Sequence, residues 1–271
     1  MPELPTYKVF ALRYATMAAR TRRDNFIFTD AHDAPMPIDY FIWAIHNDDR
    51  TIIVDTGFNR AEGERRGRTF LRQPAELLKL IGIDAANVRD VVMTHLHYDH
   101  AGNLDQFPAA TFHIQDAELN FATGRYMSHH VLSHSFYIED IVAMVRRVYA
   151  GRVRFHDGTA QLATGITLHK VGGHSGGLQI VRVHTERGWL VLASDAIHFD
   201  ENRLKRSPFP IVLHVGEMLE GHRLCEELAD REDLIIPGHD PSVLQRWPRW
   251  SADEPDIVRL DLAPKSPAAV Q

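Results

Sequence analysis

The first half of the chain alternates short apolar runs with one helical pattern. Thr51 to Gly57 is a β-branched run that ends at glycine, and Tyr40 to Ile45 has a similar character, so the two predict a hairpin that turns at residues 47–49. Apolar residues recur at helical spacing from Pro74 to Ile81, and a glycine follows directly. Residues 88–94 and 111–114 then resume the strand pattern. A helix between strands is typical of an α/β layer.

The second half has a long helix-forming segment followed by more strands. Residues 116–149 are rich in helix formers and predict a helical insertion. The strands expected after it, separated by glycine turns, cover residues 153–156, 167–171, 179–184 and 189–194. A helix at residues 217–229 leads to a last strand at residues 234–239. Strands followed by helices, twice over, predict one α/β domain across residues 1–271, with two sheets between helical layers and a loosely held tail at residues 251–271.

Composition limits the class of partner. The 271 residues include 30 basic and 36 acidic side chains, and the formal charge of −6 is not gathered into blocks that would indicate a nucleic-acid or membrane surface. The first residues lack the basic start and apolar run of a secretory signal, and no stretch approaches the ~18 apolar residues of a membrane span. We therefore expect a cytoplasmic protein that acts on a small molecule, without nucleic acid or membrane as partner.

Cysteine and histidine usage points to metal chemistry based on imidazole. The single cysteine, Cys225, excludes an internal disulfide and a cysteine-rich metal site, and it lies in an amphipathic run where it is expected to fill the core. The 17 histidines are well above ordinary usage, and imidazole is the commonest protein ligand for zinc-like metals. The places where histidines cluster are therefore the candidate sites.

Four candidate metal ligands lie within six residues, directly after an apolar strand: His95, His97, Asp99 and His100. In an extended backbone alternate side chains share a side, so His95 and His97 can converge on one ion. Asp99 and His100, on the turning chain, can reach a second ion. The competing interpretation is a loop of solvated polar residues, which requires a chance cluster at a strand end. The sequence therefore predicts a metal site with two ions.

Three later strand ends supply further ligands. His174 lies among four glycines, where the backbone can approach closely, and could complete the first ligand set. Asp195 ends an apolar strand, and its two oxygens could bridge ions held ~3.5–4 Å apart. His239 ends the strand at residues 234–239 and suits the second ion. A histidine beside glycine is often an ordinary turn residue, so the joint occurrence with the first cluster carries the prediction.

The combined pattern, His-x-His-x-Asp-His followed by Gly-His, Ser-Asp and Gly-His, resembles the metallo-β-lactamase superfamily. The resemblance covers about residues 38–245. It implies the metallo-β-lactamase fold, an αββα sandwich in which two mixed β-sheets pack between helical layers. It also implies that Asp55, in the Val-Asp-Thr-Gly turn, orients a ligand histidine and does not touch a metal.

Within this superfamily the chain is most similar to the branch of N-acyl homoserine lactonases. Residues 26–45, Pro237-Gly-His-Asp-Pro241 and Gly173-His-Ser-Gly resemble that branch. One position departs from it, because many of these lactonases carry a tyrosine three residues after the bridging aspartate, where this chain has His198. His198 could donate a hydrogen bond to the substrate carbonyl, protonate a departing alkoxide or only line the pocket.

The resemblance and the ligand set together predict a dinuclear metal-dependent hydrolase. We expect a lactonase that opens an N-acyl homoserine lactone or a related lactone, and so interferes with quorum signals, by attack of a hydroxide that bridges the two ions. Asp99 and His198 are the expected catalytic residues. Two Zn²⁺ ions suit the ligands best, although iron, manganese or cobalt fits the same set. The resemblance also suggests a homodimer.

Three alternatives stay open at this point. The same centre could hydrolyse another ester, a cyclic amide or a phosphoester, because the pocket walls choose the molecule. The chain could instead be a metal-binding sensor without turnover. Within the insertion, apolar residues between Phe121 and Met144 could wall a substrate cleft or fill a helical core, and His129, His130 and His134 could form a further metal site.

Overall fold

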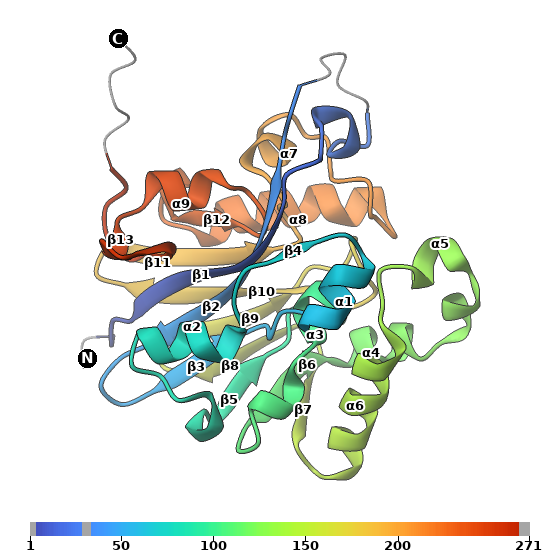
Figure 1. The fold of residues 1–271 in the computed structure, drawn as a ribbon, viewed down its shortest axis with the longest axis horizontal. Helices are drawn as coiled ribbons and strands as arrows, with labels where there is room; N and C mark the ends of the chain where they lie inside the picture. Colours follow the sequence, from blue (N-terminus) through green and yellow to red (C-terminus); the bar gives the residue numbers. More distant parts are fainter. Residues whose placement is uncertain (1–3, 29–33, 266–271) are drawn as a thin grey trace.

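The computed structural model describes residues 4–28 and 34–265, which form two packed β-sheets covered by helices (Figure 1). Within these residues the larger sheet has nine strands: β1 (Lys8–Met17), β2 (Ile38–His46), β3 (Thr51–Val54), β4 (Thr69–Phe70), β5 (Asp90–Val92), β6 (Thr111–Gln115), β7 (Val153–His156), β13 (Arg249–Ser251) and β14 (Glu254–Arg259). The smaller sheet has five: β8 (Thr159–Ala163), β9 (Ile166–Lys170), β10 (Gln179–Thr185), β11 (Gly188–Ser194) and β12 (Ile235–Pro237).

Strand pairing brings several strand ends to one edge of the sandwich. The larger sheet runs in the order β13-β14-β1-β2-β3-β5-β6-β7, with β4 paired to β1. β2 and β3 form the predicted antiparallel hairpin, whereas β3, β5, β6 and β7 are parallel. In the smaller sheet, ordered β12-β11-β10-β9-β8, the parallel pair β11 and β12 places Ser194 beside Pro237. The segments that leave β11 and β12 therefore start side by side.

Alternation along the strands divides the core into layers. In β2, Phe41, Trp43 and Ile45 face the smaller sheet, while Tyr40 and Ile42 face the helical side. Strands of the smaller sheet alternate in the same way between the space shared by the sheets and the side covered by α8. The central strands of both sheets are thus buried on two faces, as the predicted αββα sandwich requires.

Nine α-helices lie within the described residues: α1 (Arg60–Arg65), α2 (Pro74–Leu80), α3 (Tyr98–Ala101), α4 (Asp116–Ala122), α5 (His130–Ser133), α6 (Ile138–Tyr149), α7 (Asp200–Leu204), α8 (Val215–Leu228) and α9 (Ser242–Arg246). α2 begins at the predicted proline, and α4, α5 and α6 make up the predicted helical insertion. No helix in the described ranges is long and apolar enough to cross a membrane.

Both ends of the chain contribute strands that the sequence did not predict. β1 was missed, and the strand at residues 234–239 is not the last, because β13 and β14 follow it and β14 pairs with β1. The expectation of a loosely held tail at residues 251–271 is wrong for its first part, since Ile257, Val258 and Leu260 are fully buried. Residues 266–271 lie outside the described residues.

Candidate metal centre

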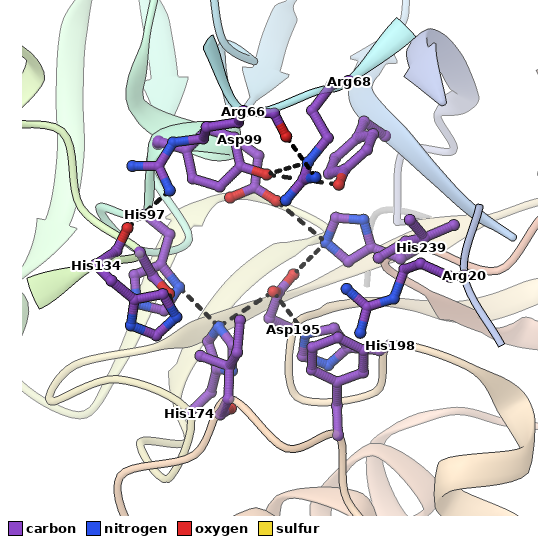
Figure 2. A pocket seen from close by; sticks show the side chains of 16 residues that line it. Arg20, Arg66, Arg68, His97, Asp99, His134, His174, Asp195, His198 and His239 are labelled. Atoms are coloured by element: carbon purple, nitrogen blue, oxygen red, sulfur yellow. Dashed lines mark hydrogen bonds and ion pairs between the residues drawn. The ribbon is translucent and has the colours of Figure 1, made fainter. Parts of the chain in front are cut away.

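All seven sequence-predicted ligands come together at one edge of the sandwich, and Figure 2 shows His97, Asp99, His174, Asp195 and His239 of this group. His95 and His97 follow β5, Asp99 and His100 both lie in α3, and the other three follow β9, β11 and β12. One set, whose ligand atoms all lie within 4.8 Å of one another, comprises His95, His97, His174 and Asp195. A second set comprises Asp99, His100 and His239. Residues up to 144 positions apart in the chain, from His95 to His239, therefore form one cluster.

The carboxylate of Asp195 lies between the two sets. Its Oδ1 atom is 3.1 Å from Nε2 of His100 and 3.0 Å from Nε2 of His239. Its Oδ2 atom is 3.1 Å from Nε2 of His174 and 3.8 Å from Nε2 of His95. Because each oxygen faces a different set, this side chain has the geometry of a carboxylate that bridges two metal ions.

The electrostatics of the cluster favour a bound cation. Burial lowers the pKa of His95 and His97 well below the ordinary value, with neighbouring imidazoles adding to the effect, so both rings are neutral. The Nε2 atoms of His95 and His100 are buried and lack a hydrogen-bond partner among the described residues. Buried polar atoms are normally satisfied, and imidazole nitrogens beside carboxylates, which lose their proton on binding, are ordinary ligands of zinc-like ions. The residues present therefore fit two divalent metal ions.

Backbone carbonyls orient two of the ligand histidines. Nδ1 of His174 donates to the carbonyl of Ile211 at 2.7 Å, and Nδ1 of His239 donates to the carbonyl of Asp39 at 2.8 Å. A carbonyl can only accept, so the proton sits on Nδ1 and the lone pair of Nε2 faces the cluster. The ring tautomers are thus set for binding through Nε2.

Two strained turns carry acidic residues into this region. Asp55 follows β3 with a φ of 62°, and Ser194, directly before Asp195, has a φ of 45°. The left-handed region is rare for residues other than glycine and tends to persist at functional sites. A side chain at Gly238 would place its Cβ 2.6 Å from the carbonyl oxygen of Ser194. The close approach of β11 and β12 therefore requires glycine before His239.

Glu118, in α4, is a buried residue that the sequence analysis missed. Its Oε1 accepts the N–H of Leu96 at 2.9 Å, and its Oε2 accepts the Ser175 hydroxyl at 2.7 Å and the N–H of Gly177 at 2.8 Å. It thereby joins the loop of His95 and His97 to the loop of His174. No motif surrounds this glutamate in the sequence, so only its position in the fold reveals the role.

His198 lies beside the cluster, as predicted, with its ring stacked on Phe209 at 4.0 Å between centroids. Its Nε2 is 2.9 Å from Oδ2 of Asp195, and its buried Nδ1 has no partner among the described residues. Burial lowers the pKa of His198 to about 3, more than the nearby Asp195 raises it. A neutral ring suits a hydrogen-bond donor better than a general acid that must carry a proton at neutral pH.

A pocket of about 170 Å³ opens over the ligands. Ile38, Phe209 and Ile211 are its apolar lining residues, and the remaining lining side chains carry hydroxyl, imidazole, carboxylate or guanidinium groups. The insertion contributes only His134 and Ser135 to this lining within the described residues. The hypothesis that apolar insertion residues wall the cleft is therefore wrong for this pocket: Phe136 lies in the core and Phe121 packs against it.

The other sequence candidates do not form sites. Cys225 is fully buried, and burial raises the pKa of its thiol to about 12, so it fills the core as expected. Among the described residues, the clusters able to hold a metal do not include His129, His130 or His134.

Comparisons with known proteins agree with the fold and the ligand pattern. The profile of the metallo-beta-lactamase superfamily matches residues 37–239. An N-acyl homoserine lactonase from Bacillus thuringiensis is 25% identical over 218 residues, which cover 73% of this chain and 81% of that protein.

Solved structures show the same fold at lower identity. The crystal structure of a quorum-quenching N-acyl homoserine lactone lactonase superposes with a TM-score of 0.72 at 21% identity, over 89% of this chain and 95% of that one. AidC, a dizinc quorum-quenching lactonase, gives a TM-score of 0.68 at 17% identity, over 97% and 96% of the two chains. The family profile covers most of the sequence and the predicted fold is confirmed, so the chain belongs to the metallo-β-lactamase superfamily.

Proposed function

We propose that this protein is a metal-dependent hydrolase that opens a lactone with the help of two divalent metal ions. The observation that carries the proposal is the position of Asp195, whose two oxygens face two separate sets of buried ligands. Zinc is the ion that neutral imidazoles and carboxylates favour, and the dizinc relative described above supports it. The similarity to N-acyl homoserine lactonases supports a cyclic ester as substrate.

Two bound ions would supply a water acidic enough to ionise near neutral pH and would polarise the carbonyl of the substrate. The chain's own residues fix where this chemistry happens. The carboxylate of Asp195 lies between the two ligand sets, with one oxygen toward each. Asp55 fixes the ring of His100 through a hydrogen bond. Hydrolysis adds water across the ring ester: the acyl carbon–oxygen bond breaks, a carboxylate forms and the ring oxygen leaves as an alcohol.

His198 is placed to assist at the carbonyl. Its ring lines the pocket next to Asp195, and its stacking on Phe209 fixes its plane. A neutral imidazole N–H would donate a hydrogen bond to the carbonyl oxygen as negative charge develops there. Asp99 is the second catalytic candidate, since it lines the pocket and its Oδ2 lies 3.9 Å from Nε2 of both His100 and His239.

The test is hydrolysis of a panel of simple lactones and of acyl homoserine lactones with short and long chains by zinc-loaded protein. Proton release reports turnover, and elemental analysis reports the metal content. We expect turnover by the native chain and its loss in Asp99→Asn and His100→Ala. Glu227→Gln, an exposed change on α8, is the matched control.

Two results would contradict the proposal. Full activity after complete removal of metal would exclude metal-dependent hydrolysis. Two bound ions without turnover of any lactone would exclude the lactonase and direct the search to other esters, cyclic amides and phosphoesters. The expected homodimer is checked on the same sample by light scattering.

A further inference from the structure

Among the described residues, three arginines line the pocket over the metal ligands, and two of them form no ion pair there. Arg20 follows β1, while Arg66 and Arg68 precede β4, so two separate segments bring them to one rim. Figure 2 shows Arg68 near Asp99 and Arg20 near His198 and His239. Nε of Arg66 pairs with Glu62 at 2.5 Å, which compensates its charge. Neither Arg20 nor Arg68 forms a salt bridge with any described carboxylate.

The hydrogen bonds of Arg20 all go to neutral groups. Nε donates to Oδ1 of Asn25 at 2.8 Å, and Nη2 donates to the carbonyl of Asp24 at 2.6 Å. The guanidinium also lies over the ring of Phe209, 4.9 Å from its centroid. The same ring stacks on His198. Nη1 has no hydrogen-bond partner within the described chain. Arg20 is therefore held rigidly, one ring away from His198, with a free donor.

Arg68 is fixed in the same manner. Nε donates to the hydroxyl of Tyr98 at 3.0 Å, and Nη1 donates to the carbonyl of Arg66 at 2.8 Å and contacts the sulfur of Met17 at 3.1 Å. Its Nη2 has no hydrogen-bond partner among the residues described. Both guanidinium groups are thus oriented by neutral hydrogen-bond partners, and neither forms an ion pair with a described carboxylate. Burial lowers the pKa of Arg68, but Tyr98, Tyr40 and the Asp99 carboxylate together raise it above the ordinary value.

The two cations influence each other. Burial lowers the pKa of Arg20 and the like charge of Arg68 adds to this, while Tyr40 and Asp24 act in the opposite direction. Some partly buried arginines carry carboxylate partners, as Arg13 does with Asp39 and Arg203 with Glu226. Others, such as Arg152 and Arg182, donate to backbone carbonyls and line no part of this pocket. Two unpaired cations beside one pocket are expected where a ligand supplies the missing negative charge.

We propose that Arg20 and Arg68 bind a carboxylate that the substrate carries away from its scissile ester, so that the enzyme prefers anionic lactones to neutral ones. This inference rests on the proposed function and names the substrate class of the same site. A carboxylate has two acceptor oxygens, and the two free Nη groups offer two donors. The pocket walls agree, because Ile38, Phe209 and Ile211 give a long apolar acyl chain little surface.

The test compares two lactones that differ only at the end of the acyl chain. One is N-hexanoyl-L-homoserine lactone, and the other is N-(5-carboxypentanoyl)-L-homoserine lactone, which ends in a carboxylate. With zinc-loaded protein we expect kcat/KM to be about tenfold or more higher for the acid, mainly through KM, because each charged hydrogen bond lost costs about a factor of ten. The preference should shrink as salt rises.

Substitutions assign the preference to the two residues. Arg20→Gln and Arg68→Gln should each lower kcat/KM for the acid about tenfold more than for the neutral lactone. Arg20→Lys and Arg68→Lys, which keep the charge, should retain part of the preference and serve if a glutamine variant folds poorly. Arg223→Gln, on the exposed face of α8, should leave both rates unchanged. Thermal unfolding and zinc content check that each variant is intact.

Binding separates this inference from the proposed function. Titration calorimetry with the two ring-opened products should show tighter binding of the acid-tipped product by the native chain, and the difference should vanish in Arg20→Gln and Arg68→Gln. Efficient turnover of both lactones with equal product affinities would overturn the inference and leave the lactonase standing. Absence of turnover with a retained difference in affinity would overturn the lactonase and leave the carboxylate site standing.

Discussion

Oδ2 of Asp55 lies 2.7 Å from Nδ1 of His100, and this contact ties the end of β3 to the turn that carries the ligands. The same carboxylate accepts the N–H and the hydroxyl of Thr94, each at 2.8 Å. Burial lowers the pKa of His100, but the carboxylates of Asp195 and Asp55 together raise it well above the ordinary value. Asp55 therefore does what the resemblance implied, which is to orient a histidine without joining the ligand clusters.

Replacement of this carboxylate should weaken metal binding. In Asp55→Asn the amide cannot accept from both Thr94 and His100, so the ring of His100 loses its fixed orientation. We expect the affinity for the ion held by Asp99, His100 and His239 to fall roughly 10- to 100-fold. Competition with a chromophoric chelator measures this affinity. Asp256→Asn, a matched change at the Arg13 ion pair in β14, should have no such effect, and equal affinities in the two variants would contradict the assignment.

Loss of the Glu118 carboxylate should loosen two ligand loops at once. In Glu118→Gln the amide NH₂ must face an N–H or hydroxyl donor, because Leu96, Ser175 and Gly177 donate to both oxygens. A buried donor without an acceptor costs about 1–3 kcal/mol. Urea unfolding of the metal-free protein should show a loss of that size. A stability change no larger than that of Glu227→Gln would show that the loops are held by other contacts.

The chemistry of the centre was more predictable than its surroundings. Each ligand follows an apolar strand or sits among glycines, so local sequence carried the signal for His95, His174 and His239. Glu118 has no such neighbourhood, and its role depends on α4 packing against two loops. Arg20 belongs to the same class, because single arginines are common and only the fold brings it to the pocket that Arg68 also lines.

The missed strands have a similar explanation. β1 is buried on both faces over most of its length, so it lacks the period-two alternation that marks a half-buried strand. β14 contains Pro255, which argues against a strand when the sequence is read alone. The residues of β14 that pair with β1 are Ile257, Val258 and Arg259, beyond the proline. The first part of the tail is therefore held by pairing with β1, a long-range contact that the local sequence pattern does not reveal.

Removal of metal should lower the stability of the whole protein. Seven ligands from four segments of the chain converge on the centre. Ions that bind only the folded state therefore add RT ln(1 + [L]/Kd), or about 4 kcal/mol at a free ion concentration a thousand times Kd. Chelation should lower the thermal midpoint by several degrees, and zinc should restore it. An unchanged midpoint after the ions are shown to be gone would mean that the ligand cluster is stable without them.

Asp140 should make the free energy of unfolding depend on pH, and replacement of its carboxyl group by the amide of asparagine should remove that dependence. Its carboxyl group is buried at the start of α6 near Glu62, and burial raises its pKa to about 7. The unfolded chain has the ordinary value near 3.9, so between about pH 4 and pH 7 the folded state binds the proton more tightly and loses stability as pH rises. Asp140→Asn stays neutral and should not show this loss.

The difference between native protein and Asp140→Asn separates the contribution of Asp140 to stability from that of every other titrating group. At pH 4.5 the two free energies of unfolding should be nearly equal, whereas at pH 8 the variant should be more stable by on the order of 1–3 kcal/mol. Urea unfolding at both pH values measures the difference, and Glu139→Gln, the exposed neighbour in the same helical turn, is the control. A gap that stays constant with pH would mean that Asp140 is already ionised in the folded protein, and that Arg66, which lies near it, compensates its charge.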